Sequence, residues 1–190
     1  QLPPAQREQI RPWIQERSGH KHEVLLQQGD PIGVLSMVKV GAVLVTRKGA
    51  DDRPRPIGIL GSGSTLGAFG LLGQRSVLGA QAITPVRLCE LQVSQLQQAE
   101  QRGLIAATHF TQAGLRAYEL LADWAQVARV QGTTGQVAAA LLILSKGQRS
   151  QMVRLPGHAV LGGLLGTTRE SVARALSRLA QHGRLLRRDR

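Results

Sequence analysis

The chain has 190 residues, of which 42% are hydrophobic, so it is long and apolar enough for one or two packed domains and is not a disordered protein. Its formal charge of +12 favours an acidic polymer or surface as the partner. Its single cysteine, Cys89, excludes an internal disulfide and a cysteine-ligated cluster, and we expect no metal site.

The first half of the chain predicts a short helix followed by strands. Residues 4–19 predict the helix, with Ile10, Trp13 and Ile14 on one side. Residues 22–93 hold short aliphatic runs that glycine-rich turns separate, such as VLSMVKVGAVLVTRKG and AQAITPVRLCELQV. Short strands at this regular spacing favour an antiparallel β-barrel or sandwich over a parallel sheet.

Helical periodicity begins near residue 93. Residues 93–101 predict a short helix and residues 108–132 a long one. The long segment carries a wide apolar stripe, with Leu120, Leu121, Trp124 and Val127 along it. We expect this stripe to meet a second copy of the chain in a homodimer. The alternative is that the helix packs wholly against its own barrel.

The C-terminal quarter predicts a separate, strongly basic helical unit. Gly132 to Gly135 act as a hinge or helix stop, and residues 136–147 predict the next helix. The apolar run at residues 137–144 is the longest in the chain and is too short to cross a bilayer, so we expect a cytoplasmic protein without a membrane partner. Residues 145–190 contain ten Lys or Arg and two acidic residues, a net charge of +8.

The last segments have the proportions of helix, tight turn and helix. Residues 158–165 predict the first helix, and Thr167 with Glu170 fits a capping box at the start of the second. On that second helix, apolar residues share one side while Glu170 and Arg174 lie on the other. The major groove of DNA admits such a helix. The alternative is an amphipathic helix whose arginines are merely solvated.

These residues resemble a known family. TTRESVARALSRL (167–179) is similar to the recognition helix of the cAMP receptor protein/FNR family of bacterial transcription regulators. The resemblance extends over almost the whole chain. LLQQGD (25–30) and VKVGAVLV (38–45) resemble the first barrel strands, and RVQGTTGQVAAALLIL (129–144) resembles the hinge and the following helix.

The resemblance implies an α+β fold and a function in transcription regulation rather than catalysis. We expect an antiparallel β-barrel of the cyclic-nucleotide-binding-like jelly-roll type (1–102), a long dimerisation helix (103–131) and a winged helix-turn-helix (132–190), whose wing is barely begun at residues 185–190. A homodimer would bind a palindromic operator in double-stranded DNA, with RNA polymerase as a further partner. The implied DNA-binding residues are Thr168, Arg169, Glu170, Ser171, Arg174 and Arg178.

The resemblance also implies an effector site in the barrel, at LGAFGLLGQRSVLGAQA (66–82). Its expected residues are Gly67, Ala68, Arg75 and Ser76. Cyclic-nucleotide-binding relatives place a glutamate where this chain has Ala68, which disfavours cAMP because a ribose hydroxyl would stay unpaired. The segment also resembles the cyanobacterial global nitrogen regulator branch, which senses 2-oxoglutarate. A cyclic nucleotide, a 2-oxoglutarate-like acid and an empty pocket therefore remain open.

Two other classes of protein compete with this interpretation. A metal-dependent cupin enzyme needs histidines on its barrel strands, and residues 23–93 contain none, so we expect no catalytic residues. A regulatory ligand-binding barrel whose helical tail contacts protein or RNA is the alternative function, and the recognition-helix pattern argues against it.

Overall fold

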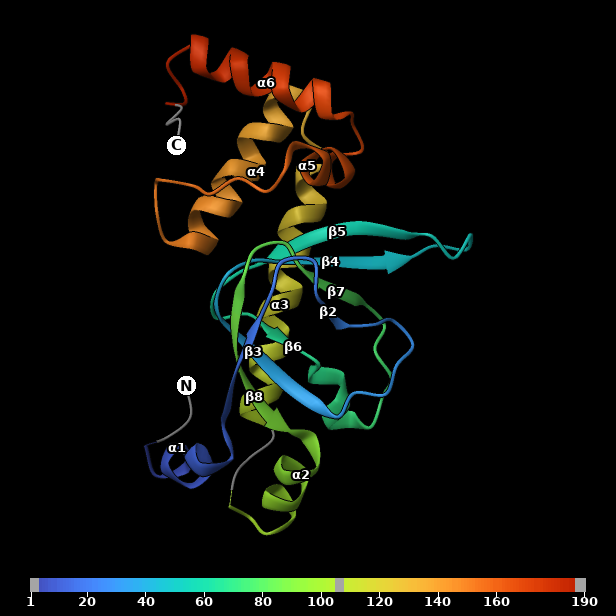
Figure 1. Ribbon diagram of the computed structural model, residues 1–190, viewed down its shortest axis with the longest axis vertical. Coiled ribbons are helices and arrows are strands. Elements are labelled where there is room, and N and C mark those ends of the chain that lie inside the picture. Colours follow the sequence, from blue (N-terminus) through green and yellow to red (C-terminus); the bar gives the residue numbers. More distant parts are fainter. Residues whose placement is uncertain (1–3, 105–107, 187–190) are drawn as a thin grey trace.

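The computed structural model describes residues 4–104 and 108–186, and its N-terminal part is built from two antiparallel sheets (Figure 1). Their strand orders are β1-β8-β3-β6 and β2-β7-β4-β5. This arrangement confirms the expected antiparallel jelly-roll-like fold, as two facing sheets rather than one closed barrel. The strands are β1 (Gln15–Gly19), β2 (Val24–Leu26), β3 (Val34–Val40), β4 (Val43–Lys48), β5 (Pro54–Leu60), β6 (Thr65–Leu66), β7 (Gly79–Ala82) and β8 (Val86–Gln92).

The inner faces of the two sheets form the core of this sandwich. Side chains alternate along β8, where Val86 and Leu88 are buried while Arg87 between them is exposed, as expected for a sheet with one solvated face. Val38 of β3 and Val43 of β4 are fully buried in the same cluster. The aliphatic pattern of the sequence therefore sets which face of each strand points inward.

Helices precede, interrupt and follow the strands of the sandwich (Figure 1). The expected N-terminal helix is shorter than residues 4–19, because residues 15–19 pair with β8 as an edge strand, with Gln15 opposite Glu90. The helices are α1 (Pro4–Ile10), the 3₁₀ turns η1 (Arg11–Trp13) and η2 (Ala68–Leu72), α2 (Val93–Gln101), α3 (Thr108–Val127), α4 (Thr133–Gln148), α5 (His158–Leu165) and α6 (Arg169–Gln181). None of the helices in the described ranges is long and apolar enough to cross a membrane.

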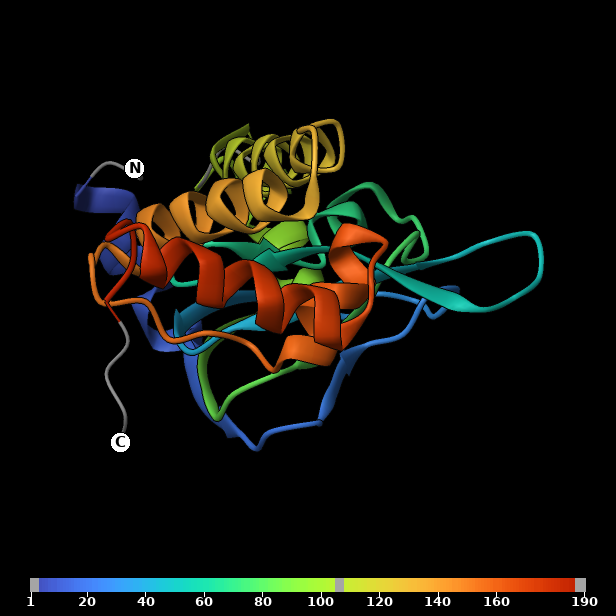
Figure 2. The same cartoon turned by 90° about the horizontal axis from the view of Figure 1, so that it is seen from above.

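A single apolar core joins the sandwich to the C-terminal helices. Ile59 of β5, Trp124 of α3, Leu161 of α5 and Val172 of α6 belong to one buried cluster. Seen from above, α4, α5 and α6 lie over the end of the sandwich (Figure 2). α5 comes so close to β5 that a Cβ on Gly163 would lie 3.2 Å from Pro56 Cγ.

The long helix α3 uses its apolar stripe within its own chain. Trp124 and Val127 are each only 3% exposed in the shared core, so the prediction that they face a partner is wrong. Leu120 and Leu121 are half-buried and pack against the sandwich core as well. The stripe is wide because the sandwich and the C-terminal helices both pack against it, which is the arrangement of the alternative interpretation.

A second, exposed apolar face runs along α3 beside the buried one. Leu115, Tyr118, Ala122 and Ala125 are all exposed and are separated by three, four and three residues. This spacing aligns them along one side of a helix, as in the seam of a coiled coil. Gln112 lies on a different, polar side of α3.

Only the first residues of the expected wing lie in the described part of the chain. Residues 182–186, the last that the structure describes, contain no strand, and residues 187–190 lie outside the described part. The wing therefore stays a prediction.

Candidate nucleic-acid interface and effector cavity

Helix α6 begins with a side-chain cap at Thr168. The Thr168 hydroxyl accepts a hydrogen bond from the Ser171 backbone N–H at 3.2 Å. The sequence predicted Thr167 in this role, which is one residue early. Thr167 belongs to the preceding turn, where its backbone N–H donates to the Gly162 carbonyl at 2.9 Å. The cap satisfies one free N–H group at the helix start and fixes where the exposed side chains of α6 begin.

The turn between α5 and α6 depends on two glycines. Gly166 ends α5 in the left-handed region at φ 62°, where a side chain would be strained. Gly162 lies against the turn, and a Cβ there would come within 2.8 Å of the Thr167 carbonyl oxygen. These glycines allow the two helices to approach in the helix-turn-helix geometry that the sequence predicted.

The outer face of α6 is basic and open. The side chains of Val172, Ala175 and Leu176 are buried on the inner face. All four charged residues expected to bind DNA are exposed, and they are Arg169, Glu170, Arg174 and Arg178. The face opposite the core therefore presents three guanidinium groups and one carboxylate to solvent.

Hydrogen bonds at the start of α6 orient two of these groups. Arg174 Nη2 donates to the Ser171 hydroxyl at 2.9 Å, which holds the guanidinium over the first turn of the helix. The backbone N–H of Glu170 itself and the Thr168 hydroxyl hold the pKa of Glu170 below its ordinary value. Glu170 is therefore a carboxylate at neutral pH and can only accept hydrogen bonds.

A further part of this face was missed by sequence reasoning. An open depression brings the residues before and at the start of α5 beside Arg169 at the start of α6. It is lined by Leu155, Pro156, Gly157, His158, Ala159 and Arg169. Free N–H groups at helix starts favour anions, so this depression suits a phosphate. The sequence predicted a helix over residues 158–165, but it did not show that the starts of the two helices would meet.

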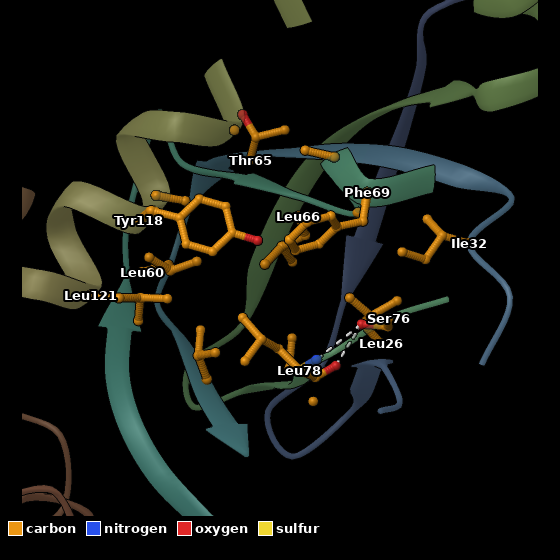
Figure 3. Close-up of a pocket in the computed structure, with 17 residues that line it drawn as sticks. Leu26, Ile32, Leu60, Thr65, Leu66, Phe69, Ser76, Leu78, Tyr118 and Leu121 are labelled. Atoms are coloured by element: carbon orange, nitrogen blue, oxygen red, sulfur yellow. Dashed lines mark hydrogen bonds between the residues drawn. The ribbon is translucent and has the colours of Figure 1, made fainter. Parts of the chain in front are cut away.

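The effector residues expected in the sandwich divide between a cavity and the surface. Gly67, Ala68 and Ser76 line a cavity of about 50 Å³ between the sheets and α3 (Figure 3). Arg75 is not among the lining residues. Its Nη1 donates to the Gly29 carbonyl at 2.9 Å, and its backbone forms a bridge with Pro31. The guanidinium therefore holds a loop instead of facing the cavity.

The polar groups of the cavity are hydroxyls. The Ser76 hydroxyl is engaged with the backbone of Leu78, since it donates to the carbonyl at 2.6 Å. Tyr118 of α3 forms a T-shaped pair with Phe69, with ring centroids 5.6 Å apart, and burial raises the pKa of its phenol. The cavity thus has apolar walls and neutral polar groups.

Two family models match the chain, one over the N-terminal sandwich and one over the C-terminal helices. Residues 16–102 match the model of the cyclic nucleotide-binding domain, and residues 135–190 match that of the Crp-like helix-turn-helix domain. A search of the curated proteins found no match.

Solved structures share the arrangement of the whole chain. The c-di-GMP responsive global regulator CLP from Xanthomonas campestris is 26% identical, with 97% of this chain and 95% of that chain covered at a TM-score of 0.71. FixK2 from Bradyrhizobium japonicum is 24% identical, with 90% and 86% covered at a TM-score of 0.75. A CRP-family transcriptional regulator from Thermus thermophilus is 18% identical, with 91% and 88% covered at a TM-score of 0.68. The last two show a common fold, and the resemblance to the nitrogen-regulator branch stays a prediction.

Proposed function

Because the chain joins a cyclic nucleotide-binding domain to a Crp-like helix-turn-helix domain, it is a CRP/FNR-type transcription regulator, and we propose that it binds a palindromic operator as a homodimer. The observation that carries the proposal is the capped helix α6, whose exposed face presents Arg169, Glu170 and Arg174 beside one another. In this proposal residues 1–102 are the sensor, 103–131 the dimerisation helix and 132–190 the DNA-binding domain.

The chemistry of the α6 side chains supports distinct roles on DNA. Arg169 and Arg174 can each donate two hydrogen bonds to a guanine edge, and the Glu170 carboxylate can accept from the amino group of cytosine. Thr168 and Ser171, at the helix start, would contact the backbone phosphates that flank those bases. Exposed Arg178 and, beyond α6, Arg184 add phosphate contacts that depend on salt.

Dimer formation is supported by the exposed apolar face of α3. Leu115, Ala122 and Ala125 recur at helical spacing and lie outside the buried cores. Two copies packed along this face would relate their α6 helices by two-fold symmetry. Paired recognition helices one DNA turn apart, about 34–36 Å, read the two halves of a palindrome.

The remaining parts of the proposal concern control and location. A small effector in the sandwich would act through α3, which lines the cavity and packs against α4. We also propose a cytoplasmic location and RNA polymerase as a further partner, because both accord with a role in transcription. The alternative, a regulatory module whose tail binds protein or RNA, is an outcome of the test below.

The test is binding to duplexes selected from a random pool. The selected duplex, a scrambled duplex of equal composition and a single half-site are compared by fluorescence anisotropy at about 50 and 200 mM salt. We expect preference for the intact palindrome over both controls, and weaker binding at higher salt. Equal binding to selected and scrambled duplexes would leave only a non-specific basic surface. If the selection yields no duplex at all, the result would favour the alternative with a protein or RNA partner.

A matched pair of variants separates base readout from phosphate contact. Arg174→Ala should cost about 1–3 kcal/mol on the selected duplex and little on the scrambled one. Arg184→Ala, which removes the same charge near the end of α6, should weaken both complexes equally. If Arg174→Ala weakened binding to the selected and the scrambled duplex equally, Arg174 would contact phosphate alone.

A further inference from the structure

The cavity between the sheets is enclosed by strands on one side and by helix α3 on the other (Figure 3). Leu60, Leu66 and Leu78 form part of its apolar wall, and Ala117 and Leu121 come from α3. Tyr118 and Phe69 stand at one end, and in Figure 3 the Tyr118 hydroxyl points toward the side chains at the centre. A molecule in this space would touch both the sandwich and α3.

The cavity offers no opposite charge to a charged ligand. No Asp, Glu, Lys, Arg or His side chain lines it in the described ranges, and Arg75 is bonded to the Gly29 carbonyl elsewhere. A phosphate or carboxylate placed here would lose its water shell without gaining an opposite charge, which is strongly unfavourable. The same argument excludes an ammonium group.

One hydroxyl of the cavity wall, that of Thr65, is without a hydrogen-bond partner within the described part of the chain. Thr65 is only 5% exposed and its Oγ1 is buried and unpaired. Tyr118 is 39% exposed, and its partial burial raises the pKa of the phenol, so it is a neutral donor beside the cavity. The buried Thr65 hydroxyl without a partner is costly, and a ligand atom that pairs with it recovers that cost.

The size of the cavity limits the ligand. Its volume of about 50 Å³ holds roughly three to five non-hydrogen atoms, at about 10–15 Å³ for each water-sized group. Sites for drug-sized ligands, the size class of a nucleotide, are about 300–1,000 Å³. A compact molecule fits without rearrangement of the sheets.

We propose that this cavity is a binding site for a small, uncharged, mainly apolar molecule that carries one hydrogen-bonding group, placed between the sheets and α3. The ligand packs its apolar part against the leucines and pairs its polar group with Thr65 or Tyr118. The inference rests on the proposed function in one respect, since it identifies the class of effector that the sandwich takes. It concerns binding by the free protein and is tested without DNA.

The experiment uses probes of similar size and different charge. 1-Butanol, butylammonium and butyrate are titrated into the full chain, and binding is followed by NMR shifts of methyl groups that line the cavity, such as those of Ala80 and Leu66. 1-Butanol should give saturable shifts in the millimolar range, on the order expected for five non-hydrogen atoms. Both charged probes should bind at least tenfold more weakly, and cAMP and 2-oxoglutarate should leave these methyl groups unshifted.

Variants of the cavity residues test whether 1-butanol binds in the cavity. Thr65→Val with Tyr118→Phe keeps the shape of both side chains and should weaken 1-butanol roughly 2- to 10-fold. Ala80→Leu, which fills the cavity, should abolish the saturable shifts. Ala117→Val fills it from the α3 side and replaces Ala80→Leu if that variant does not fold. Continued binding by a folded cavity-filled variant would place the alcohol elsewhere and overturn the proposal.

The remaining outcomes are equally decisive. Absence of saturable shifts with 1-butanol would show that the cavity is a packing defect only. Binding of butyrate, cAMP or 2-oxoglutarate as tight as that of 1-butanol would assign a charged ligand instead. Either result would leave palindrome binding by the same protein unaffected, so failure of this inference is separable from failure of the proposed function.

Discussion

The indole Nε1 of Trp124 donates a hydrogen bond to the backbone carbonyl of Ile59 across 3.2 Å. Both residues are buried, Trp124 at 3% and Ile59 at 4% exposure. The bond ties the long helix α3 to strand β5, at the point where the C-terminal helices also pack. The bond therefore lies at the junction between the sandwich and the C-terminal helices.

Trp124→Phe should destabilise the protein by about 1–3 kcal/mol, because the Ile59 carbonyl is left buried without its donor. The free energy of unfolding in urea, followed by circular dichroism, measures the change. Trp13→Phe is the matched control, since Trp13 is half-buried at the other end of the sandwich. An equal loss in both variants would mean that aromatic bulk, rather than the hydrogen bond, carries the effect.

Gly58→Ala should also cost about 1–3 kcal/mol, through overpacking at the same junction. A Cβ at Gly58 would lie 2.6 Å from Leu121 Cδ2 and 3.0 Å from Trp124 Cδ1. Gly61→Ala, in the turn after β5, meets its nearest atom at an ordinary 3.5 Å and should be close to neutral. Thermal unfolding of the two variants compares them directly, and similar melting temperatures would contradict the close packing of α3 on β5.

Thr168→Val should destabilise the protein by about 1 kcal/mol, because it removes the side-chain cap of α6. Thr167→Val tests the capping box that the sequence suggested and should cost less, since the backbone N–H of Thr167 makes the turn contact. Urea unfolding gives both values. A larger loss of stability for Thr167→Val than for Thr168→Val would mean that Thr167 caps the helix, as predicted from the sequence.

Glu170 should titrate below the ordinary pKa of a glutamate, because its own backbone N–H and the Thr168 hydroxyl stabilise the carboxylate. Its stabilising contribution is therefore complete above the pKa of the unfolded chain, about 4.3, and is lost as the pH falls through the lower folded-state value. Carboxyl ¹³C NMR follows this titration, and Thr168→Val should raise the pKa toward the ordinary value. Glu170→Gln should flatten the dependence of stability on pH in this window, and an unshifted pKa would remove the argument that Glu170 is oriented by the helix start.

Ala122→Glu should dissociate the proposed homodimer, because two glutamates would oppose each other along the exposed apolar face of α3. Gln112→Glu adds the same charge on the polar side of α3 and should leave the dimer intact. Sedimentation equilibrium measures the mass of each variant. A dimer that survives Ala122→Glu, or a wild-type monomer, would place the two-fold interface elsewhere or remove it.

Much of the fold could be predicted because the periodicity of a segment's own residues matches the element that it forms. The periodicity of residues 93–101 and 158–165 predicted helices that the structure contains as α2 and α5. β1 was missed because its residues lack alternation, and their conformation comes from pairing with β8, whose residues Val86–Gln92 lie far along the chain. Such non-local pairing leaves little trace in a short segment.

Part of the candidate site could likewise be predicted from local spacing, and part could not. The apolar and polar sides of α6 follow from helical spacing, so its exposed arginines were predictable. Spacing gave the apolar stripe on α3, but it could not tell whether Trp124 meets the chain's own core or a second copy. Nor could it show that Arg75 turns to the Gly29 carbonyl, because that depends on a loop brought close only by folding.

The core that joins β5 to α5 and α6 has a consequence for cooperativity. Leu161 and Val172 are covered in part by the cluster that contains Ile59 and Trp124, so neither end buries its apolar surface alone. The two ends should therefore melt in one calorimetric transition, unlike domains joined by a solvated linker. A fragment cut at the Gly132 hinge would expose this surface and would be prone to aggregate, although it keeps every residue of the helix-turn-helix.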